Sequence, residues 1–592
     1  MFTPITMKTI IASILLTGCV LCTACQKELG YTGFEGSYNP IAKEAVNMST
    51  DKACYNPGAS VSFTADKIPA GEIYVRYRHL GDVVEETKVT STKWVWTAPS
   101  DDYKGYLVEI FQKTDDGDNV LGTIGVDVSS DWDRFPRYGF LSKFGTMDKK
   151  VSDAIIDNLN RFHINGVQFQ DWHYKHHWPL GGTAENPLET YLDIASRQTS
   201  LTTLKNYISR IHEYGMKAIF YNLCFGVLDD AEEDGVSSSW YLYNESSCKT
   251  VNHHPLGAPF KSSIYLVDPG NPEWLEYIGE KNDDVYAVLD FDGYQIDQLG
   301  YRGTLYNADG QSVNLPDRYA EFINAMKSRH PEKDLIMNAV SNYGADKIIG
   351  TGKTVFGYNE MWAGESGFSS LSAAVEDNYR FSSDKCRTVF AAYMNYNVAD
   401  KLGYFNTPGV ILTDAVMFAL GASHLELGEH MLGKEYFPNS NLVMKPDLKE
   451  AMICYYDFLV AYENLLRDGG SFNDISITSV NSAHSIKSWP PQPGKLTTLT
   501  KKVGNRQVVH LLNFIKADSN SWRDIDGTMP EPDLLESVVI DIPTDGEVKR
   551  VWMASPDHKG GAVEDLTYKS AGGKIRISIP HLKYWDMIVV EY

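Results

Sequence analysis

The sequence predicts a multidomain chain in which a (β/α)8 TIM-like barrel lies between an N-terminal immunoglobulin-like β-sandwich and a C-terminal Greek-key β-sandwich. Its length of 592 residues suffices for roughly three or four domains. Short alternating strands occupy residues 46–130 and 469–592, whereas buried-looking strands alternate with helical segments over residues 131–468. Eight strand–helix units can be counted in that central part, and eight units close such a barrel.

Residues 1–25 are predicted to be an export signal. Lys8 precedes an apolar run that is too short to span a membrane, and the run ends in two cysteine-containing stretches that resemble a bacterial lipobox. We expect lipidation at Cys25, with Cys19 as the alternative site, followed by a linker over residues 26–45. The expected location is the bacterial outer membrane, at the cell surface or the periplasmic face, through a lipid anchor. An ordinary secretory signal is the alternative.

The N-terminal module shows the period of two that is typical of half-buried strands. Segments 60–64, 73–77 and 106–111 alternate apolar with polar residues, and Pro57 and Gly58 mark one of the turns between strands. This spacing favours an immunoglobulin-like sandwich. The C-terminal part returns to the same rhythm at 508–514, 538–542 and 587–590, which predicts the second sandwich.

The barrel strands are predicted at 138–142, 166–171, 217–222, 293–297, 335–339, 355–360, 388–393 and 423–427. Residues 151–162 and 204–214 are amphipathic helical segments, and Pro272 and Pro316 stand where a helix start tolerates proline. A doubly wound open sheet is the alternative. The barrel is favoured because no glycine-rich dinucleotide fingerprint follows the first strand.

Charge and cysteine usage narrow the classes of partner and cofactor. The formal net charge of −23 repels phosphate backbones and anionic membrane surfaces, so we expect no nucleic-acid partner. After the signal, five widely scattered cysteines offer neither a disulfide framework nor metal-ligand spacing. We expect no cofactor and a monomeric protein.

Two carboxylates are predicted at the face of the barrel that carries active sites, the carboxyl ends of its strands. Asp297 ends the fourth strand and Glu360 ends the sixth. Retaining glycoside hydrolysis needs a carboxylate nucleophile and a carboxyl proton donor about 5–5.5 Å apart. Glu365 lies five residues beyond Glu360 in a glycine-containing turn and is the alternative proton donor.

Further polar and aromatic residues are predicted at the same rim. Flat rings stack on the C–H faces of sugars, while amides and carboxylates bind sugar hydroxyls, so this mixture indicates a neutral polyhydroxylated substrate. The predicted substrate-binding residues are Asp171, Trp172, Tyr174, His176, Asn222, Gln298, Asn338, Tyr358, Trp362, Tyr393 and Glu426. The run of His173, His176 and His177 could also indicate a metal site. We expect no metal, because the carboxylates that would complete such a site belong to the proposed chemistry.

Three segments and the order of domains resemble glycoside hydrolase family 66, the dextranases and cycloisomaltooligosaccharide glucanotransferases. The segments are QFQDW at 168–172, DGYQID at 292–297 and YNEMW at 358–362. The resemblance implies that Asp297 is the nucleophile and Glu360 the general acid/base. It also implies endo-hydrolysis of α-1,6 linkages of dextran to isomaltooligosaccharides, with retention by double displacement.

Two alternative functions stay open at this point. The cyclising branch of the family carries an additional carbohydrate-binding module within the barrel, and no such strand-rich block interrupts this sequence, which favours hydrolysis over cyclising transglucosylation. A non-catalytic surface glycan-binding lipoprotein would share the anchor, the β-modules and the aromatic residues. It would not need two carboxylates at the ends of strands four and six.

Overall fold

The computed structural model describes residues 45–115, 117–480 and 484–592. The predicted signal segment with Cys19 and Cys25, and all of the predicted linker except Ala45, lie outside these ranges. Within the described ranges, no helix is long and apolar enough to cross a membrane. Export and lipidation therefore stay predictions.

The N-terminal module consists of two antiparallel sheets packed on one shared hydrophobic core. Burial alternates along its strands as the sequence predicts, with Val61 and Phe63 buried and Ser60 and Thr64 exposed. The immunoglobulin-type connectivity stays a prediction. The sheet orders are β1 (Met48–Thr50), β2 (Ser60–Ala65), β5 (Lys93–Thr97), and β4 (Asp82–Lys88), β3 (Ile73–His79), β6 (Lys104–Thr114), β7 (Gly117–Val128).

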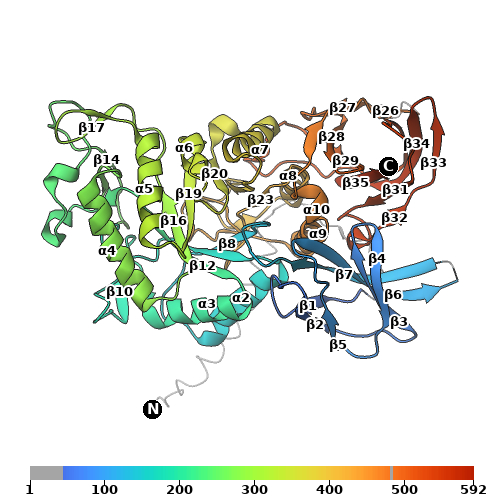
Figure 1. The fold of residues 1–592 in the computed structure, drawn as a ribbon, viewed down its shortest axis with the longest axis horizontal. Coiled ribbons are helices and arrows are strands. Elements are labelled where there is room, and N and C mark those ends of the chain that lie inside the picture. The colour runs from blue at the N-terminus through green and yellow to red at the C-terminus, as the bar shows by residue number, and fades with distance from the viewer. Residues whose placement is uncertain (1–44, 116, 481–483) are drawn as a thin grey trace, which may run out of the picture.

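An eight-stranded parallel sheet forms the centre of the molecule (Figure 1). Each of the eight predicted strands is present, shifted by no more than a few residues at its ends. Their spatial order follows the chain, as in a (β/α)8 barrel. The strands are β8 (Tyr138–Leu141), β9 (Gly166–Phe169), β12 (Lys217–Leu223), β16 (Gly293–Asp297), β19 (Asp334–Val340), β20 (Gly357–Met361), β21 (Thr388–Ala392) and β23 (Ser423–His424).

The two edges of this sheet meet, which distinguishes it from the open-sheet alternative. A parallel bridge joins Phe140 of β8 to Gly428, four residues after β23. The backbone N–H of Phe140 donates to the carbonyl of Leu427 at 3.0 Å. The barrel is therefore nearly closed, with its weakest seam between the first and last strands.

Helices connect the strands and surround the barrel. The two predicted amphipathic helices are observed as α2 (Lys149–Arg161) and α3 (Leu201–Glu213). Pro272 begins α4 (Pro272–Val288), and Pro316 is the second residue of α5 (Leu315–Arg329), as expected for prolines in a first helical turn. The others are α6 (Ala345–Gly350), α7 (Phe368–Ser382), α8 (Thr407–Ala419), α9 (Pro446–Ala461) and α10 (Glu463–Leu466).

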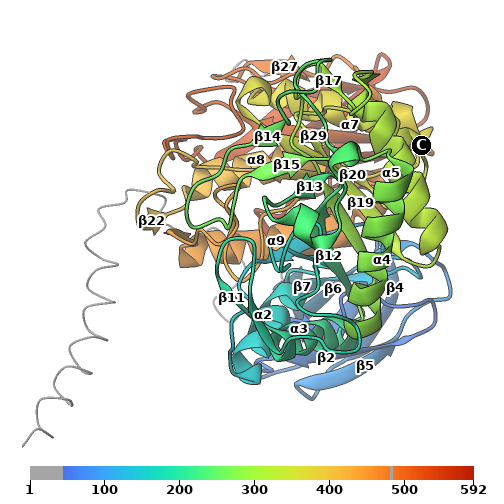
Figure 2. The same ribbon diagram turned by 90° about the vertical axis from the view of Figure 1, so that its left-hand side faces the viewer.

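Several connections after barrel strands carry small sheets that the sequence does not predict. Two of these small sheets, which contain β14 and β17, lie at the end of the molecule opposite the two β-modules and face the viewer in Figure 2. These strands are β10 (Thr190–Leu192), β11 (Gln198–Ser200), β13 (Gly226–Val227), β14 (His253–His254), β15 (Ile264–Leu266), β17 (Leu305–Tyr306), β18 (Ser312–Val313), β22 (Gly403–Tyr404) and β24 (Leu442–Val443).

The C-terminal module also has two sheets around a shared core. The Greek-key connectivity stays a prediction. The first sheet contains β25 (Ser471–Asn473), β27 (Ile486–Ser488), β28 (Leu496–Val503), β29 (Arg506–Asn513), β35 (Trp585–Glu591), β31 (Arg550–Ala554) and β32 (Glu564–Asp565). The second contains β26 (Thr478–Ser479), β30 (Leu535–Pro543), β34 (Lys574–Leu582) and β33 (Tyr568–Ala571).

Candidate active site

Alternate residues of the barrel strands point into the barrel, because side chains of a strand alternate between its two faces. Ile219, Ile336 and Val389 fill the lower interior as part of one buried cluster. Closer to the carboxyl ends of the strands, the inward-facing residues Gln295 and Asp297 of β16 line a cavity instead of packing in this core. The carboxyl ends of the strands thus surround a hollow above a filled barrel.

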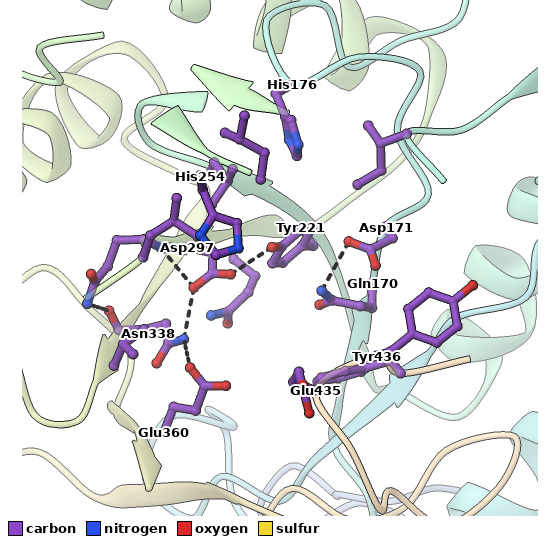
Figure 3. Close-up of a pocket in the computed structure, with 18 of the residues that line it drawn as sticks. Gln170, Asp171, His176, Tyr221, His254, Asp297, Asn338, Glu360, Glu435 and Tyr436 are labelled. Carbon is purple, nitrogen blue, oxygen red and sulfur yellow. Dashed lines mark hydrogen bonds between the residues drawn. The ribbon is translucent and has the colours of Figure 1, made fainter. Parts of the chain in front are cut away.

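This cavity has a volume of about 560 Å³, within the range of ligand pockets. Its residues come from the strand ends and from the connections that follow them (Figure 3). Strand ends contribute Gln168, Gln170, Asp171, Tyr221, Leu223, Gln295, Asp297, Gln298, Asn338, Val340, Tyr358, Glu360, Trp362 and Tyr393. Connections contribute His176, Ile194, His254, Leu256, Pro259, Phe260, Ile264, Leu299, Glu435, Tyr436 and Phe437.

One amide joins the two predicted catalytic carboxylates. Asn338 donates from Nδ2 to Oδ1 of Asp297 at 2.8 Å and to Oε2 of Glu360 at 3.0 Å. Because both distances start from one nitrogen, these two carboxylate oxygens lie no more than 5.8 Å apart. Figure 3 shows Asp297 and Glu360 directed into the same space from neighbouring sides of the barrel.

Asp297 is held by three donors. Besides Asn338, the Tyr221 hydroxyl donates to Oδ2 at 2.7 Å and the backbone N–H of Gln298 donates to Oδ1 at 2.8 Å. Burial raises the pKa of Asp297, and these hydrogen bonds, led by that of Tyr221, oppose the rise because they stabilise the ionised form. The donors also fix the direction of its carboxylate oxygens.

Glu360 has the environment of a proton donor. Burial, followed by the negative charge of Asp297, raises the pKa of Glu360 from 4.5 to about 7. The Tyr393 hydroxyl donates to Oε1 of Glu360 at 2.6 Å and limits this rise. Two linked carboxyl groups that favour different protonation states are the arrangement needed for general acid/base chemistry.

A third carboxyl group lies across the cavity. Burial raises the pKa of Asp171 to about 7, and Asp193 and Asp297 add to this effect while Arg197 opposes it. Gln170 donates to Oδ1 of Asp171 at 3.2 Å. Asp171 has a φ of 52°, a left-handed conformation that is uncommon outside glycine, and Arg197 donates to its carbonyl at 3.1 Å. Its side chain is thereby directed at the cavity (Figure 3).

The structure brings nine of the sequence-predicted residues to this cavity. They are Asp171, His176, Asp297, Gln298, Asn338, Tyr358, Glu360, Trp362 and Tyr393. The alternative proton donor Glu365 does not line it. Its carboxylate instead accepts from the backbone N–H of Trp362 at 3.0 Å and from Asn342 at 3.3 Å.

Four predicted substrate-binding residues do not line the cavity, and a role for them in binding stays a prediction. Trp172 is fully buried and packs against Phe220 and Phe291. Tyr174 stacks on the Lys261 ammonium group outside the lining.

Asn222 and Glu426 are the other two. Asn222 lies on the outward face of β12, and Glu426 lies two residues beyond the end of β23. Asn222 donates to the carbonyl of His176 at 2.8 Å, and Glu426 accepts from Tyr456 of α9 at 2.9 Å. Asn222 is one residue away from an inward position, so strand alternation directs it to the surrounding connections.

The three histidines after β9 do not act together on one ligand position. His173 and His176 hydrogen bond to each other at 2.9 Å, whereas His177 bonds Asp234 at 2.9 Å. The Lys175 ammonium group forms ion pairs with both Asp230 and Asp234, at 2.6 Å from each. Burial lowers the pKa of His176 to about 3, so it lines the cavity as a neutral ring.

Sequence reasoning missed several cavity residues. Tyr221 lies in the predicted third strand and pairs with Gln295 of β16, which places it on the same inward face as Asp297. Gln170 lies two residues after the inward-facing Gln168 of β9. The sequence does not show the register between strands, so neither residue could be chosen from it. His254, Glu435 and Tyr436 lie on long connections, where no periodic signal indicates the direction of a side chain.

A nearly closed eight-stranded parallel barrel, with linked carboxyl groups at the ends of its fourth and sixth strands, is the architecture of a barrel-type glycoside hydrolase. The sequence profile described as glycosyl hydrolase family 66 matches residues 50–589. The chain therefore belongs to this family, which confirms the resemblance seen in the sequence.

Individual relatives carry two activities in their names. A cycloisomaltooligosaccharide glucanotransferase of Niallia circulans is 27% identical over 701 residues, covering 92% of this chain and 71% of the relative. A dextranase of Streptococcus salivarius is 24% identical over 571 residues, covering 82% and 67%. The solved structure of a Paenibacillus sp. cycloisomaltooligosaccharide glucanotransferase complexed with cycloisomaltoheptaose superposes with a TM-score of 0.83 at 25% identity, covering 92% of this chain and 99% of that one.

Proposed function

We propose that this protein is a retaining endo-dextranase that hydrolyses internal α-1,6-glucosidic linkages of dextran to isomaltooligosaccharides. The observation that carries the proposal is the Asn338 amide shared by Asp297 and Glu360, which holds one oxygen of each carboxylate within 5.8 Å of the other. Retaining enzymes separate their carboxyl groups by about 5–5.5 Å, whereas inverting enzymes need about 6.5–9.5 Å to admit a water.

In the first step Asp297 attacks the anomeric carbon of a bound glucosyl unit. Glu360 transfers its proton to the glycosidic oxygen, so the leaving chain departs as an alcohol and a covalent glucosyl–enzyme ester remains. Esterification removes the charge of Asp297, and the pKa of Glu360 then falls. Glu360 can therefore take a proton from water, which opens the ester and restores both groups.

The remaining predicted residues that line the cavity fit a neutral sugar. Trp362, Tyr358 and Tyr393 offer aromatic surface, while Asp171 and His176 offer hydrogen-bonding groups on the opposite wall. We propose that these residues bind glucosyl units next to the cleaved bond. The dextranase among the relatives supports dextran as the substrate.

Cyclising transglucosylation is the second candidate, favoured by the glucanotransferase relatives and the superposable structure. The sequence alignment with the 27% identical glucanotransferase supports hydrolysis in one respect, the residues of the relative that have no counterpart here. It runs over 701 residues, yet 92% of the 592 residues here is about 545, so the glucanotransferase has well over a hundred residues with no counterpart in this chain. These unmatched residues lie within the aligned region of the relative and offer surface for returning a product's far end to the site, which this chain lacks there.

Product analysis on dextran separates the candidates. We expect linear isomaltooligosaccharides with reducing ends, whose newly formed anomeric centre is first observed by NMR in the α configuration. Pullulan and starch serve as controls and should not be degraded at α-1,4 linkages. Predominantly cyclic products would assign the chain to the transferases, and an initial β product would contradict the retaining mechanism. Binding of dextran with no product of either kind would identify a glycan-binding lipoprotein instead.

We also propose that the chain is exported and anchored by lipid at Cys25. The apolar run after Lys8 and the lipobox-like stretches support this. Metabolic labelling with a radioactive fatty acid should mark the wild-type protein and not a Cys25→Ala variant. Persistent labelling of that variant, lost in Cys19→Ala, would move the anchor to Cys19.

A further inference from the structure

A second cavity lies where the barrel meets the C-terminal module. It has a volume of about 300 Å³, at the lower end of the range for ligand pockets. One wall comes from α7 and the end of α8, and the other comes from β27, β28 and the residues at β25. Figure 1 shows α7 beside β27 and β28 at this junction. None of its lining residues belongs to the active-site cavity.

Two aromatic rings form part of this cavity and are fixed in place. The indole N–H of Trp489 donates to the Ser372 hydroxyl at 3.0 Å, which ties the ring to α7. The ring of Phe472 lies 5.4 Å from the Lys501 ammonium nitrogen. Both rings are half-buried, so each keeps an accessible surface while its other side packs on the protein. Buried Leu420 and Leu499 contribute apolar surface beneath them.

Oxygen atoms surround these rings. Glu376 and Asp474 are exposed carboxylates at the cavity, and Ser488, Thr498 and Thr500 add hydroxyl groups. The carboxylates accept hydrogen bonds from hydroxyl groups and repel anions. A neutral ligand with an apolar face and many hydroxyl groups therefore fits better than a phosphorylated or acidic one.

We propose that this crevice is a secondary binding site for one or two glucosyl units of the polymer that the active site cleaves. The proposal rests on the proposed function for the identity of the polymer. Rings of Trp489 and Phe472 would cover the C–H faces of a sugar, and the surrounding oxygens would accept its hydroxyl protons. A polymer can reach both sites at once, whereas a short oligosaccharide cannot.

The consequence for kinetics follows from effective concentration. A glucan chain held at the junction raises the local concentration of its other segments near Asp297, without any new contact at the reacting bond. This lowers the KM for a long chain and leaves the kcat unchanged. Substrates of a few glucosyl units gain nothing from the second site.

The test uses dextran of high molecular mass and isomaltotetraose as probes of the full-length protein. Trp489→Ala should raise the KM on dextran by roughly five- to tenfold through loss of the second attachment, with kcat and all kinetics on isomaltotetraose within about twofold of wild type. In an Asp297→Asn background, which prevents cleavage, the same change should reduce retardation in a gel that contains dextran.

Two further variants guard against a fold defect. The double variant Glu376→Gln and Asp474→Asn alters exposed groups only and should also weaken retardation. Trp94→Ala removes a half-buried tryptophan of the N-terminal module, outside both cavities, and should not change retardation. Unchanged retardation and KM in both junction variants would overturn the proposal. If the wild-type protein does not cleave dextran, the proposed function fails instead, a result that the cleavage assay reports independently of the gel.

Discussion

The two catalytic candidates, Asp297 and Glu360, accept hydrogen bonds that stabilise their ionised forms. Among the donors are Asn338, Tyr221 and Tyr393. Asn338 donates to both carboxylates, Tyr221 to Asp297 and Tyr393 to Glu360. Burial raises the pKa of both groups, but Glu360 also experiences the charge of Asp297 and reaches about 7. The donors around Asp297 favour its ionised form, and Glu360, with a pKa of about 7, still holds a proton part of the time at neutral pH.

Replacing Asp297 by alanine should remove nearly all turnover of dextran, because the carboxylate that attacks the anomeric carbon is then missing. We expect kcat to fall well below a tenth of the wild-type value, which corresponds to more than about 1.4 kcal/mol. Reducing-sugar release measures the loss, and far-UV circular dichroism confirms that the variant is folded. A folded variant with more than a tenth of the wild-type kcat would show that Asp297 is not the nucleophile.

Tyr393→Phe should move the alkaline limb of the pH profile. In the wild type, kcat/KM should fall as pH rises through about 7, because Glu360 then loses the proton that it must donate. The Tyr393 hydroxyl stabilises ionised Glu360, so removing it raises the pKa of Glu360 further and shifts this limb to higher pH. Tyr221→Phe is the matched control, since it acts on Asp297 and should shift the acidic limb upward instead. An alkaline limb that stays in place in Tyr393→Phe would refute this assignment.

Glu360→Gln tests role as well as location. A leaving group that needs no proton, such as fluoride on an isomaltosyl donor, should be cleaved far better than dextran by this variant. Hydrolysis of the covalent intermediate then becomes slow for want of a base, and added azide should restore turnover. The azide product should have the α configuration by NMR. Equal loss on both substrates without rescue, or a β-configured azide, would place the acid/base function elsewhere, with Glu365 the first residue to test.

Strand parity explains which site residues the sequence could predict. Asp297, Asn338 and Glu360 all occupy inward-facing positions, and counting by two along their own strands gives four more cavity residues, Gln295, Val340, Tyr358 and Trp362. On the third strand, the predicted residue Asn222 faces away from the cavity, whereas its neighbour Tyr221 lines it. Parity could not have identified Tyr436 or Glu435, since a long connection has no fixed period.

The elements themselves could be predicted well where they are buried on both faces. Barrel strands such as β8 and β21 consist almost entirely of buried apolar or aromatic residues, and α2 and α3 carry a regular amphipathic pattern. The two-residue strands of the connections, such as β13 and β17, are too short to carry a pattern. Their formation depends on packing against the barrel, and that packing cannot be read from the sequence.

The seam that closes the barrel depends on one glycine. A Cβ atom at Gly428 would lie 2.4 Å from the carbonyl oxygen of Phe140, far inside van der Waals contact. Gly428→Ala should therefore separate the first and last strands and destabilise the protein by about 1–3 kcal/mol. Thermal unfolding followed by circular dichroism measures the change.

The matched control is Gly350→Ala at the end of α6, where an added Cβ meets no atom within 4 Å. That change should leave the melting temperature unchanged or raise it slightly, because alanine favours a helix over glycine. Equal melting temperatures for the two variants would show that the barrel does not need close approach at its seam.

Hydrogen bonds between elements distant in the sequence join all three parts of the molecule. The N-terminal module contacts the C-terminal one through Thr123, whose hydroxyl donates to the carbonyl of Gly560 at 2.8 Å. The backbone N–H of Gly125 donates to Asp457 of α9 at 3.1 Å. A segment of the C-terminal module reaches the barrel top, where the carbonyl of Arg523 accepts from the backbone N–H of Asn395 at 3.0 Å. Both β-modules therefore contact the barrel, and we expect all three parts of the molecule to contribute to its free energy of unfolding.

A buried ion triad at the junction of the N-terminal module and the barrel tests this sharing. Arg137, fully buried, donates to Asp127 of β7 at 2.8 Å and to Glu463 of α10 at 3.5 Å. Burial raises the pKa of Glu463 well above its usual value, and the charge of Asp127 adds to the rise. In Asp127→Asn that repulsion disappears, the pKa of Glu463 falls, and Glu463 can ionise to pair with Arg137.

Each single variant, Asp127→Asn or Glu463→Gln, should therefore lose much less stability than the double variant, because the remaining carboxylate can still pair with Arg137. The double variant leaves Arg137 buried without any carboxylate partner, and we expect it to lose about 3–5 kcal/mol, more than the sum of the two single losses. Urea unfolding at neutral pH, followed by tryptophan fluorescence and circular dichroism, measures all three. Asp153→Asn, which breaks a surface pair with Lys149, is the control and should change stability by less than about 1 kcal/mol. Additive losses in the double variant would mean that the two carboxylates do not replace each other.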